Sequence, residues 1–273
     1  MSDWKAFTVE RNGRVARVTL TGPGKGNAMG PDFWSELPQV FNELDADTEI
    51  RAIVLTGSGK NFSFGLDLPA MSPTFGPLLG EKALAAPRTD FMYEIRAMQD
   101  AVTAVAGCRK PVIAAVSGWC VGGGLDLIAA ADIRLASAEA TFSLREAKVA
   151  IVADMGSLHR LPAIIGEGHL RELAFTGKDI DAARAEKIGL LNDVYPDQDA
   201  VLAAADALAG EIADNPPLVV QGVKDVLDQP QAAKVADGLR YVAAWNAAFL
   251  PSEDLTEAIQ AVFEKRKPEF GGK

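Results

Sequence analysis

The pattern of apolar and polar positions predicts a sheet that begins near the start of the chain. Two apolar runs, 7–10 and 15–20, flank an Asn-Gly pair, which is typical of a β-hairpin with a tight turn. Apolar positions with helical spacing follow over 31–44, and the apolar run at 50–56 predicts a buried strand. The chain therefore opens with the order ββαβ.

Helices and strands alternate through the middle of the chain. The expected elements are a helix at 89–106, a strand at 111–116, a short helix after 124, strands at 133–135 and 141–144, helices from 157 onward including 170–176 and 182–188, and a last short strand at Val194. Such alternation implies βα units in which helices cover a mainly parallel sheet, so the predicted fold class is α/β. The stretch 69–88 is rich in proline and glycine and has the composition of a loop.

After Asp199 the pattern becomes helical only. Helices are expected at 200–214, 218–227, 231–249 and 252–267, with a break at the Asn-Pro-Pro of 215–217. We therefore expect two regions, an α/β core over 1–199 and an all-helical region over 200–273 that serves packing or assembly.

Composition and charge exclude several classes of protein. Hydrophobic residues make up 48% and charged residues 23% of the 273 residues, as in soluble globular proteins. The net charge of −10 argues against a nucleic-acid surface, and an anionic substrate must meet a local cluster of Lys and Arg. Two cysteines are too few for a metal cluster and are expected to be reduced. We find no signal peptide, and the longest uncharged run, 15 residues at 111–125, is too short to span a membrane, so a cytoplasmic protein is predicted.

The stretch 111–132, PVIAAVSGWCVGGGLDLIAAAD, carries the first chemical signal. Three glycines, 122–124, lie at the start of the short helix, where backbone N–H groups have no intrahelical partner and the helix dipole favours negative charge. Asp126 follows in an apolar setting, where an ionised carboxylate is costly unless it is paired or used. The dinucleotide-binding fingerprint is absent. The stretch is therefore either a plain packing unit or a set of backbone N–H donors beside an acid, which would suit a developing oxyanion.

A second glycine turn, NFSFGLDL at 61–68, follows the strand at 50–56. Such a turn after a strand can present a second backbone N–H to a crevice. Two unrelated surface turns are equally compatible with the spacing. The Gly-Lys pair at 24–25 lacks the remaining residues of a P-loop, so that motif is excluded.

Two further acids, Glu146 and Asp154, lie 20 and 28 residues after Asp126. No G-x-S-x-G motif is present and the two histidines have no evident nucleophile as a partner, so the chain favours carboxylate acid/base chemistry over nucleophilic catalysis. Structural roles are the alternative: Asp154 could cap a helix, and Glu146 could pair with Arg145 or Lys148 at the surface.

The strings NFSFGLDL, KPVIAAVSGWCVGGGLDL, AADIRLAS and FSLREAKVAIVADMGSLHRLPAIIG occur in an order and at a spacing that resemble the crotonase (enoyl-CoA hydratase/isomerase) superfamily across almost the whole chain. The resemblance implies a crotonase-type spiral of ββα units with an all-helical C-terminal region, and homotrimers that pair into homohexamers. It also implies an acyl-CoA thioester substrate, and an oxyanion hole made by the backbone N–H groups of Phe64 and Gly123.

The three acids Asp126, Glu146 and Asp154, with GGGLDL, REA, ADMGSLHRLP and GNAMGPDFW, most resemble the Δ3,5-Δ2,4-dienoyl-CoA isomerases of that superfamily. The resemblance implies that Glu146 is the base at C2, that Asp154 is the acid at C6 and that Asp126 orients them or shifts their pKa values. No metal ion and no cofactor is implied, because coenzyme A is part of the substrate. Phe64 is bulkier than the small residue usual at its position, and Lys148 replaces an acid.

Residues that resemble the family's substrate and CoA contacts are Lys25, Ala28, Ser63, Gly65, Leu66, Asp67, Gly122 and Lys265. Phe263 is displaced by one position from the family's more usual spacing. The alternatives within the fold are an enoyl-CoA hydratase or a Δ3-Δ2-enoyl-CoA isomerase. A non-enzymatic alternative is an acyl-CoA-binding or RNA-binding protein, against which the three intact acids and the acidic net charge count.

Overall fold

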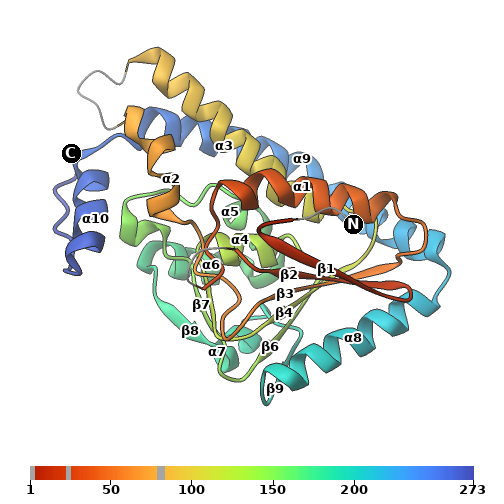
Figure 1. The fold of residues 1–273 in the computed structure, drawn as a ribbon. Coiled ribbons are helices and arrows are strands. Elements are labelled where there is room, and N and C mark those ends of the chain that lie inside the picture. The colour runs from red at the N-terminus through yellow and green to blue at the C-terminus, as the bar shows by residue number, and fades with distance from the viewer. Residues whose placement is uncertain (1–3, 23–25, 79–83) are drawn as a thin grey trace.

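The computed structural model describes residues 4–22, 26–78 and 84–273. Its large sheet has the order β1-β2-β3-β4-β6-β9, in which β1 and β2 are antiparallel and every other pair is parallel (Figure 1). The strands are β1 (Phe7–Asn12), β2 (Val15–Leu20), β3 (Ala52–Gly57), β4 (Val112–Val116), β6 (Ile133–Ser137) and β9 (Asp193–Tyr195). A smaller sheet consists of β5 (Trp119–Val121), β7 (Thr141–Ser143) and β8 (Asp179–Asp181).

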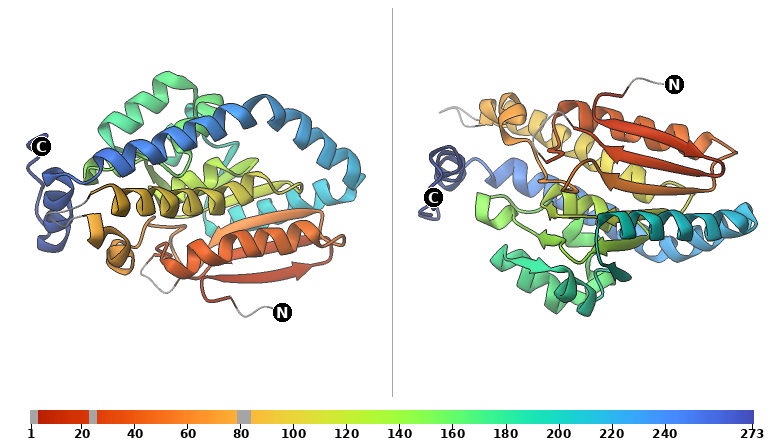
Figure 2. Two further views of the ribbon diagram at one scale, coloured as in Figure 1. Left: turned by 90° about the horizontal axis from the view of Figure 1, so that it is seen from above. Right: turned by 60° about the horizontal axis from the view of Figure 1, so that its bottom comes forward.

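Helices cover both faces of the large sheet. The helices of the described chain are α1 (Pro31–Ala46), α2 (Leu68–Phe75), α3 (Ala85–Ala106), α4 (Gly123–Ala129), α5 (Ser157–Arg160), α6 (Pro162–Thr176), α7 (Ala182–Lys187), α8 (Gln198–Asp214), α9 (Pro217–Phe249) and α10 (Glu253–Glu264), with 3₁₀ turns η1 (Gly76–Leu78) and η2 (Glu146–Val149). Helices α1, α3 and α9 lie on one side of the sheet and α8 lies on the other (Figure 1). Helices α3 and α9 run side by side, and α10 lies at one end of the molecule (Figure 2).

The central strands β3 and β4 are buried at every position because both faces of the sheet are covered there. Side chains alternate along β3: Ile53 and Leu55 join the core under α1 and α3, whereas Ala52 and Val54 pack in the second core against α8. Strand β4 divides its residues between the two cores in the same way. The predicted α/β class, the hairpin and the alternation are therefore confirmed.

One predicted break is wrong. The expected separate helices at 218–227 and 231–249 form a single helix, α9, that continues through Pro230. A proline inside a helix leaves the carbonyl four residues earlier without its donor. Here that carbonyl belongs to Val226, and both residues are exposed in the single subunit, so the unpaired group is not buried in the core of the chain.

The stretch 69–88 also differs from the predicted loop. It contains most of α2, the turn η1 and the beginning of α3. Helix α2 forms because Asp67 caps it: the Asp67 side chain accepts a hydrogen bond of 3.0 Å from the backbone N–H of Ala70. Strands β5 and β8 were not expected, since three-residue strands carry too few positions for a period to be seen.

A partly buried ion pair joins α9 to the sheet. Lys224 Nζ donates to Asp132 Oδ2 at 2.7 Å, and the same oxygen accepts from Val112 N at 2.7 Å. Lys224 is 8% exposed. Within the described chain no helix combines the length and the low polarity that crossing a bilayer requires.

We expect Lys224→Met to lower the free energy of unfolding by about 2 kcal/mol, because it leaves Asp132 without its buried cation. Urea unfolding at neutral pH measures the change. Lys234→Met is the matched control, since Lys234 is an exposed residue of the same helix. Equal effects of the two substitutions would show that the pair does not hold α9 in place.

Candidate active site

The glycines after β5 let the chain turn sharply into α4. Gly122 has φ 54°, a conformation that favours glycine, and a Cβ there would lie 3.3 Å from Glu146 Oε1. Gly123 begins α4, and a Cβ on it would lie 2.8 Å from Met29 Sδ. As the first residue of the helix, Gly123 has an N–H that the helix itself does not use.

The second glycine turn lies against the first. Gly65 has φ 78°, and a Cβ there would come within 2.6 Å of Val121 O and 3.0 Å of Gly123 N. Ser63 is completely buried and holds this turn: its hydroxyl accepts from Gly65 N at 3.0 Å and donates to Asn27 O at 2.8 Å. The two turns are therefore one structural unit and not two unrelated surface turns.

Phe64 stands at the edge of this unit. Its backbone N–H donates to Gly26 O at 2.9 Å, so the expected oxyanion donor already has a protein acceptor. Its ring is 38% exposed and lies 6.4 Å from the ring of Trp119, over which the guanidinium of Arg145 sits at 5.5 Å.

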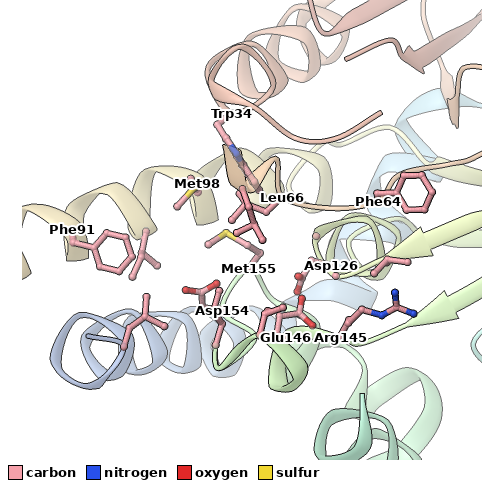
Figure 3. Close-up of a pocket in the computed structure, with 18 residues that line it drawn as sticks. Trp34, Phe64, Leu66, Phe91, Met98, Asp126, Arg145, Glu146, Asp154 and Met155 are labelled. Atoms are coloured by element: carbon pink, nitrogen blue, oxygen red, sulfur yellow. The ribbon is translucent and has the colours of Figure 1, made fainter. Parts of the chain in front are cut away.

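The three acids line a single pocket of about 230 Å³. Along it, Phe64 and Arg145 lie toward one end, Asp126 and Glu146 come next, then Asp154, and Phe91 lies toward the other end (Figure 3). Residues far apart in the sequence thus place their carboxyl groups in a row, with the glycine turns at one end of the row.

Asp126 is 1% exposed, and its Oδ1 accepts a hydrogen bond of 2.6 Å from Ser157 N, the first residue of α5. Asp126, and not Asp154, therefore binds the N-terminal end of this helix. The alternative in which Asp154 is merely a helix cap is wrong.

Asp154 Oδ2 accepts a hydrogen bond of 2.7 Å from Asn246 Nδ2. Glu146 lines the pocket, and its Oε2 is buried without a hydrogen-bond partner among the described residues. Arg145 pairs with Asp179, and among the described residues Glu146 forms no ion pair with Arg145 or Lys148, so the alternative of a surface ion pair for Glu146 is wrong.

Burial raises the pKa of each of the three carboxyl groups. For Glu146, burial comes first and the nearby Asp126 adds to it, so its pKa lies well above the ordinary value. Burial raises the pKa of Asp154 to about 7, against the opposing hydrogen bond from Asn246. Burial also raises the pKa of Asp126, while hydrogen bonds from Ser157 lower it. Three buried carboxyl groups close together favour the retention of protons at neutral pH. A general acid must hold a proton at that pH in order to donate it.

The remaining predicted contact residues divide into two groups. Leu66 and Gly122 line the pocket, whereas Ser63 and Gly65 shape the turn behind it. Asp67 caps α2, Ala28 lies in the loop before Met29 and is not part of the pocket lining, and Lys265 is an exposed residue at the end of α10. Lys25 lies outside the described residues.

Sequence reasoning missed two buried amides and much of the apolar wall. Asn246 and Gln99 contact Asp154, and their signal was a lone amide within an apolar helical pattern. The apolar wall includes Trp34, Phe91, Ile95, Met98 and Leu250. No group of three or more His, Cys, Asp and Glu in the described parts of the chain has the arrangement of a metal site.

The family model for enoyl-CoA hydratase/isomerase matches residues 10–273, and the chain belongs to that family. It is 42% identical to the mitochondrial Δ(3,5)-Δ(2,4)-dienoyl-CoA isomerase of Dictyostelium discoideum, over 99% of this chain and 92% of that protein. It is 38% identical to the peroxisomal Δ(3,5)-Δ(2,4)-dienoyl-CoA isomerase of Arabidopsis thaliana, over 99% and 98%. The predicted resemblance is therefore confirmed.

Solved structures confirm the fold. The enoyl-CoA hydratase/isomerase from Pseudoalteromonas atlantica T6c superposes with a TM-score of 0.84 at 26% identity, over 98% of this chain and all of that one. The predicted crotonase-type architecture with a helical C-terminal region is thus the observed one.

The raised pKa of Asp154 predicts a loss of stability as the pH rises. Between its ordinary value of 3.8 and about 7, the folded protein holds a proton at Asp154 that the unfolded chain has released. The free energy of unfolding should therefore fall across this window, and Asp154→Asn should lose less stability than the parent between pH 5 and 8. Urea unfolding at the two pH values measures this, with Asp100→Asn, at an exposed site on α3, as the control. Identical pH dependence in the parent and Asp154→Asn would contradict the raised pKa.

Proposed function

We propose that this protein isomerises a 3,5-dienoyl-CoA to the 2,4-dienoyl-CoA. The observation that carries the proposal is the row of Asp126, Glu146 and Asp154 in one pocket, which begins beside the glycine turns. The two relatives named above, both dienoyl-CoA isomerases by name, support it. A hydratase needs acid/base groups near C2 and C3 of the acyl chain, whereas this row supplies a further acid, Asp154, at the end away from the glycine turns (Figure 3).

The reaction moves one proton and two double bonds. Glu146 removes a proton from C2, and the negative charge spreads from the thioester oxygen along the conjugated chain to C6. Asp154 then donates a proton to C6, which leaves Glu146 protonated and Asp154 ionised until a proton returns to Asp154. Burial, with the nearby Asp126 adding to it, raises the pKa values of both acids, and the reaction starts from the state in which Glu146 is ionised and Asp154 is protonated.

The thioester oxygen would accept a hydrogen bond from Gly123 N–H at the start of α4. The second proposed donor, Phe64 N–H, donates to Gly26 O in this structure and must break that hydrogen bond before it can donate to the substrate oxygen.

A metal ion or redox cofactor has no role in this proton transfer. Lys25 and Lys265 are proposed to meet the CoA phosphates, and the cytoplasmic location remains a prediction, since the two relatives are named as mitochondrial and peroxisomal.

The Asp154→Asn substitution tests the proposed role of the distal acid. Isomerisation of 3,5-dienoyl-CoA should fall about 10²- to 10⁴-fold, while exchange of the C2 hydrogen with solvent persists because Glu146 remains. Glu146→Gln should abolish both reactions. Product formation followed by absorbance, and exchange followed by NMR in D₂O, measure the two steps. Isomerisation by Asp154→Asn at the parent rate would refute the proposed acid.

We further propose that the helical region 200–273 packs subunits into a homotrimer or a homohexamer. Helix α9 exposes a series of large apolar residues: Leu218, Val219, Val223, Val226, Leu227, Tyr241, Trp245 and Phe249. A soluble chain rarely leaves so many on one helix without a partner.

Light scattering coupled to size exclusion, at micromolar concentration, should give three or six times the mass of 28.9 kDa. A monomer under these conditions would contradict the assembly but not the proposed reaction.

A further inference from the structure

Asn246 connects the C-terminal helix to the active site. It lies on α9 and is 1% exposed. Its Nδ2 donates to Asp154 Oδ2 at 2.7 Å and to Val152 O at 2.9 Å. A backbone carbonyl can only accept, so the contact with Val152 fixes which end of the amide faces Asp154.

The orientation of this amide determines which oxygen of Asp154 can carry a proton. Because the Asn246 N–H group is a donor, Asp154 Oδ2 is the acceptor, and the carbonyl oxygen of a carboxylic acid accepts a hydrogen bond more strongly than its hydroxyl oxygen. The transferable proton is therefore assigned to Oδ1. Residues 151–154 belong to no helix or strand, so side-chain contacts must hold this carboxyl in place.

Gln99 on α3 provides an internal comparison. It is 3% exposed, and its Nε2 donates to Asp154 O at 2.8 Å and to Leu239 O at 3.0 Å. Two buried amides thus bind the same residue, Asn246 through the carboxyl group and Gln99 through the backbone carbonyl. If Asn246 served only to hold Asp154 in place, replacing Asn246 and replacing Gln99 should have the same effect on the titration of Asp154.

We propose that Asn246 is a positioning residue for the reaction: it orients the Asp154 carboxyl group so that Oδ1 carries the proton, and it stabilises the ionised group after the proton has left. This inference rests on the proposed role of Asp154 as the acid. The other titratable groups of the pocket are Asp126 on α4, Glu146 on η2 and Arg145 beside it, and a substitution at position 246 retains all of them.

Asn246→Leu, which is similar in size but has no donor, tests the proposal against Gln99→Met. The hydrogen bond from Asn246 lowers the pKa of Asp154, so its loss should raise that pKa above about 7 and move the pH profile of kcat upward. We expect kcat to fall on the order of 10- to 100-fold, with KM little changed. Gln99→Met should leave the titration of Asp154 unshifted, although it also removes a buried amide.

Carbon-13 NMR of labelled aspartate reports the titration of Asp154 directly, with Asp154→Asn to assign the signal. Asn246→Asp is the second variant, because it keeps the size of the side chain and its added carboxyl should also raise the pKa of Asp154. An unshifted Asp154 signal in Asn246→Leu, or an equal shift in Gln99→Met, would overturn the proposal; if Asn246→Leu does not fold, an unshifted signal in Asn246→Asp would overturn it. The titration needs no substrate and is therefore independent of the activity assay. A parent protein that fails to isomerise 3,5-dienoyl-CoA would refute the proposed function. The titration would still show whether Asn246 controls the pKa of Asp154.

Discussion

Three carboxyl groups share one largely apolar pocket, and most features of the site follow from the cost of placing them there. A buried carboxylate is unfavourable unless donors compensate it, and two neighbouring carboxylates cannot both ionise easily. The fold compensates Asp126 with Ser157 N–H and Asp154 with the Asn246 amide, and it leaves Glu146 Oε2 without a partner. The result is a pocket that retains protons near neutral pH, with its acids held at separate positions along a row.

The rigid parts of the site come from backbone geometry. The turns at Gly65 and Gly122 approach so closely that a side chain at either position would meet the facing turn or Glu146. This contact joins the segment after β3 to the segment after β5, which brings the start of α4 next to the row of acids. The engaged N–H of Phe64 is the one element of the proposed oxyanion hole that must change partner when substrate binds.

Much of this arrangement could be predicted from the sequence because its signals are local. Apolar runs marked the central strands, consecutive glycines marked the start of α4, and isolated acids marked the pocket. The rest depends on contacts between distant segments. The sequence could not show that Asn246 reaches Asp154, because that contact depends on packing between α9 and the loop after η2. It also could not show that α9 continues through Pro230, because this depends on which face of the helix is exposed.

A comparison of two substrates tests the central claim most directly. Purified protein is given 3,5-dienoyl-CoA in one reaction and a 2-enoyl-CoA of the same chain length in another, and kcat/KM is measured for isomerisation and for hydration. The row of three acids predicts that isomerisation of the dienoyl substrate exceeds hydration by at least about 100-fold, the share that one acid/base group commonly contributes. Hydration as fast as isomerisation would contradict the account, because it would show that the pocket places water at C3 and makes no use of the distal acid.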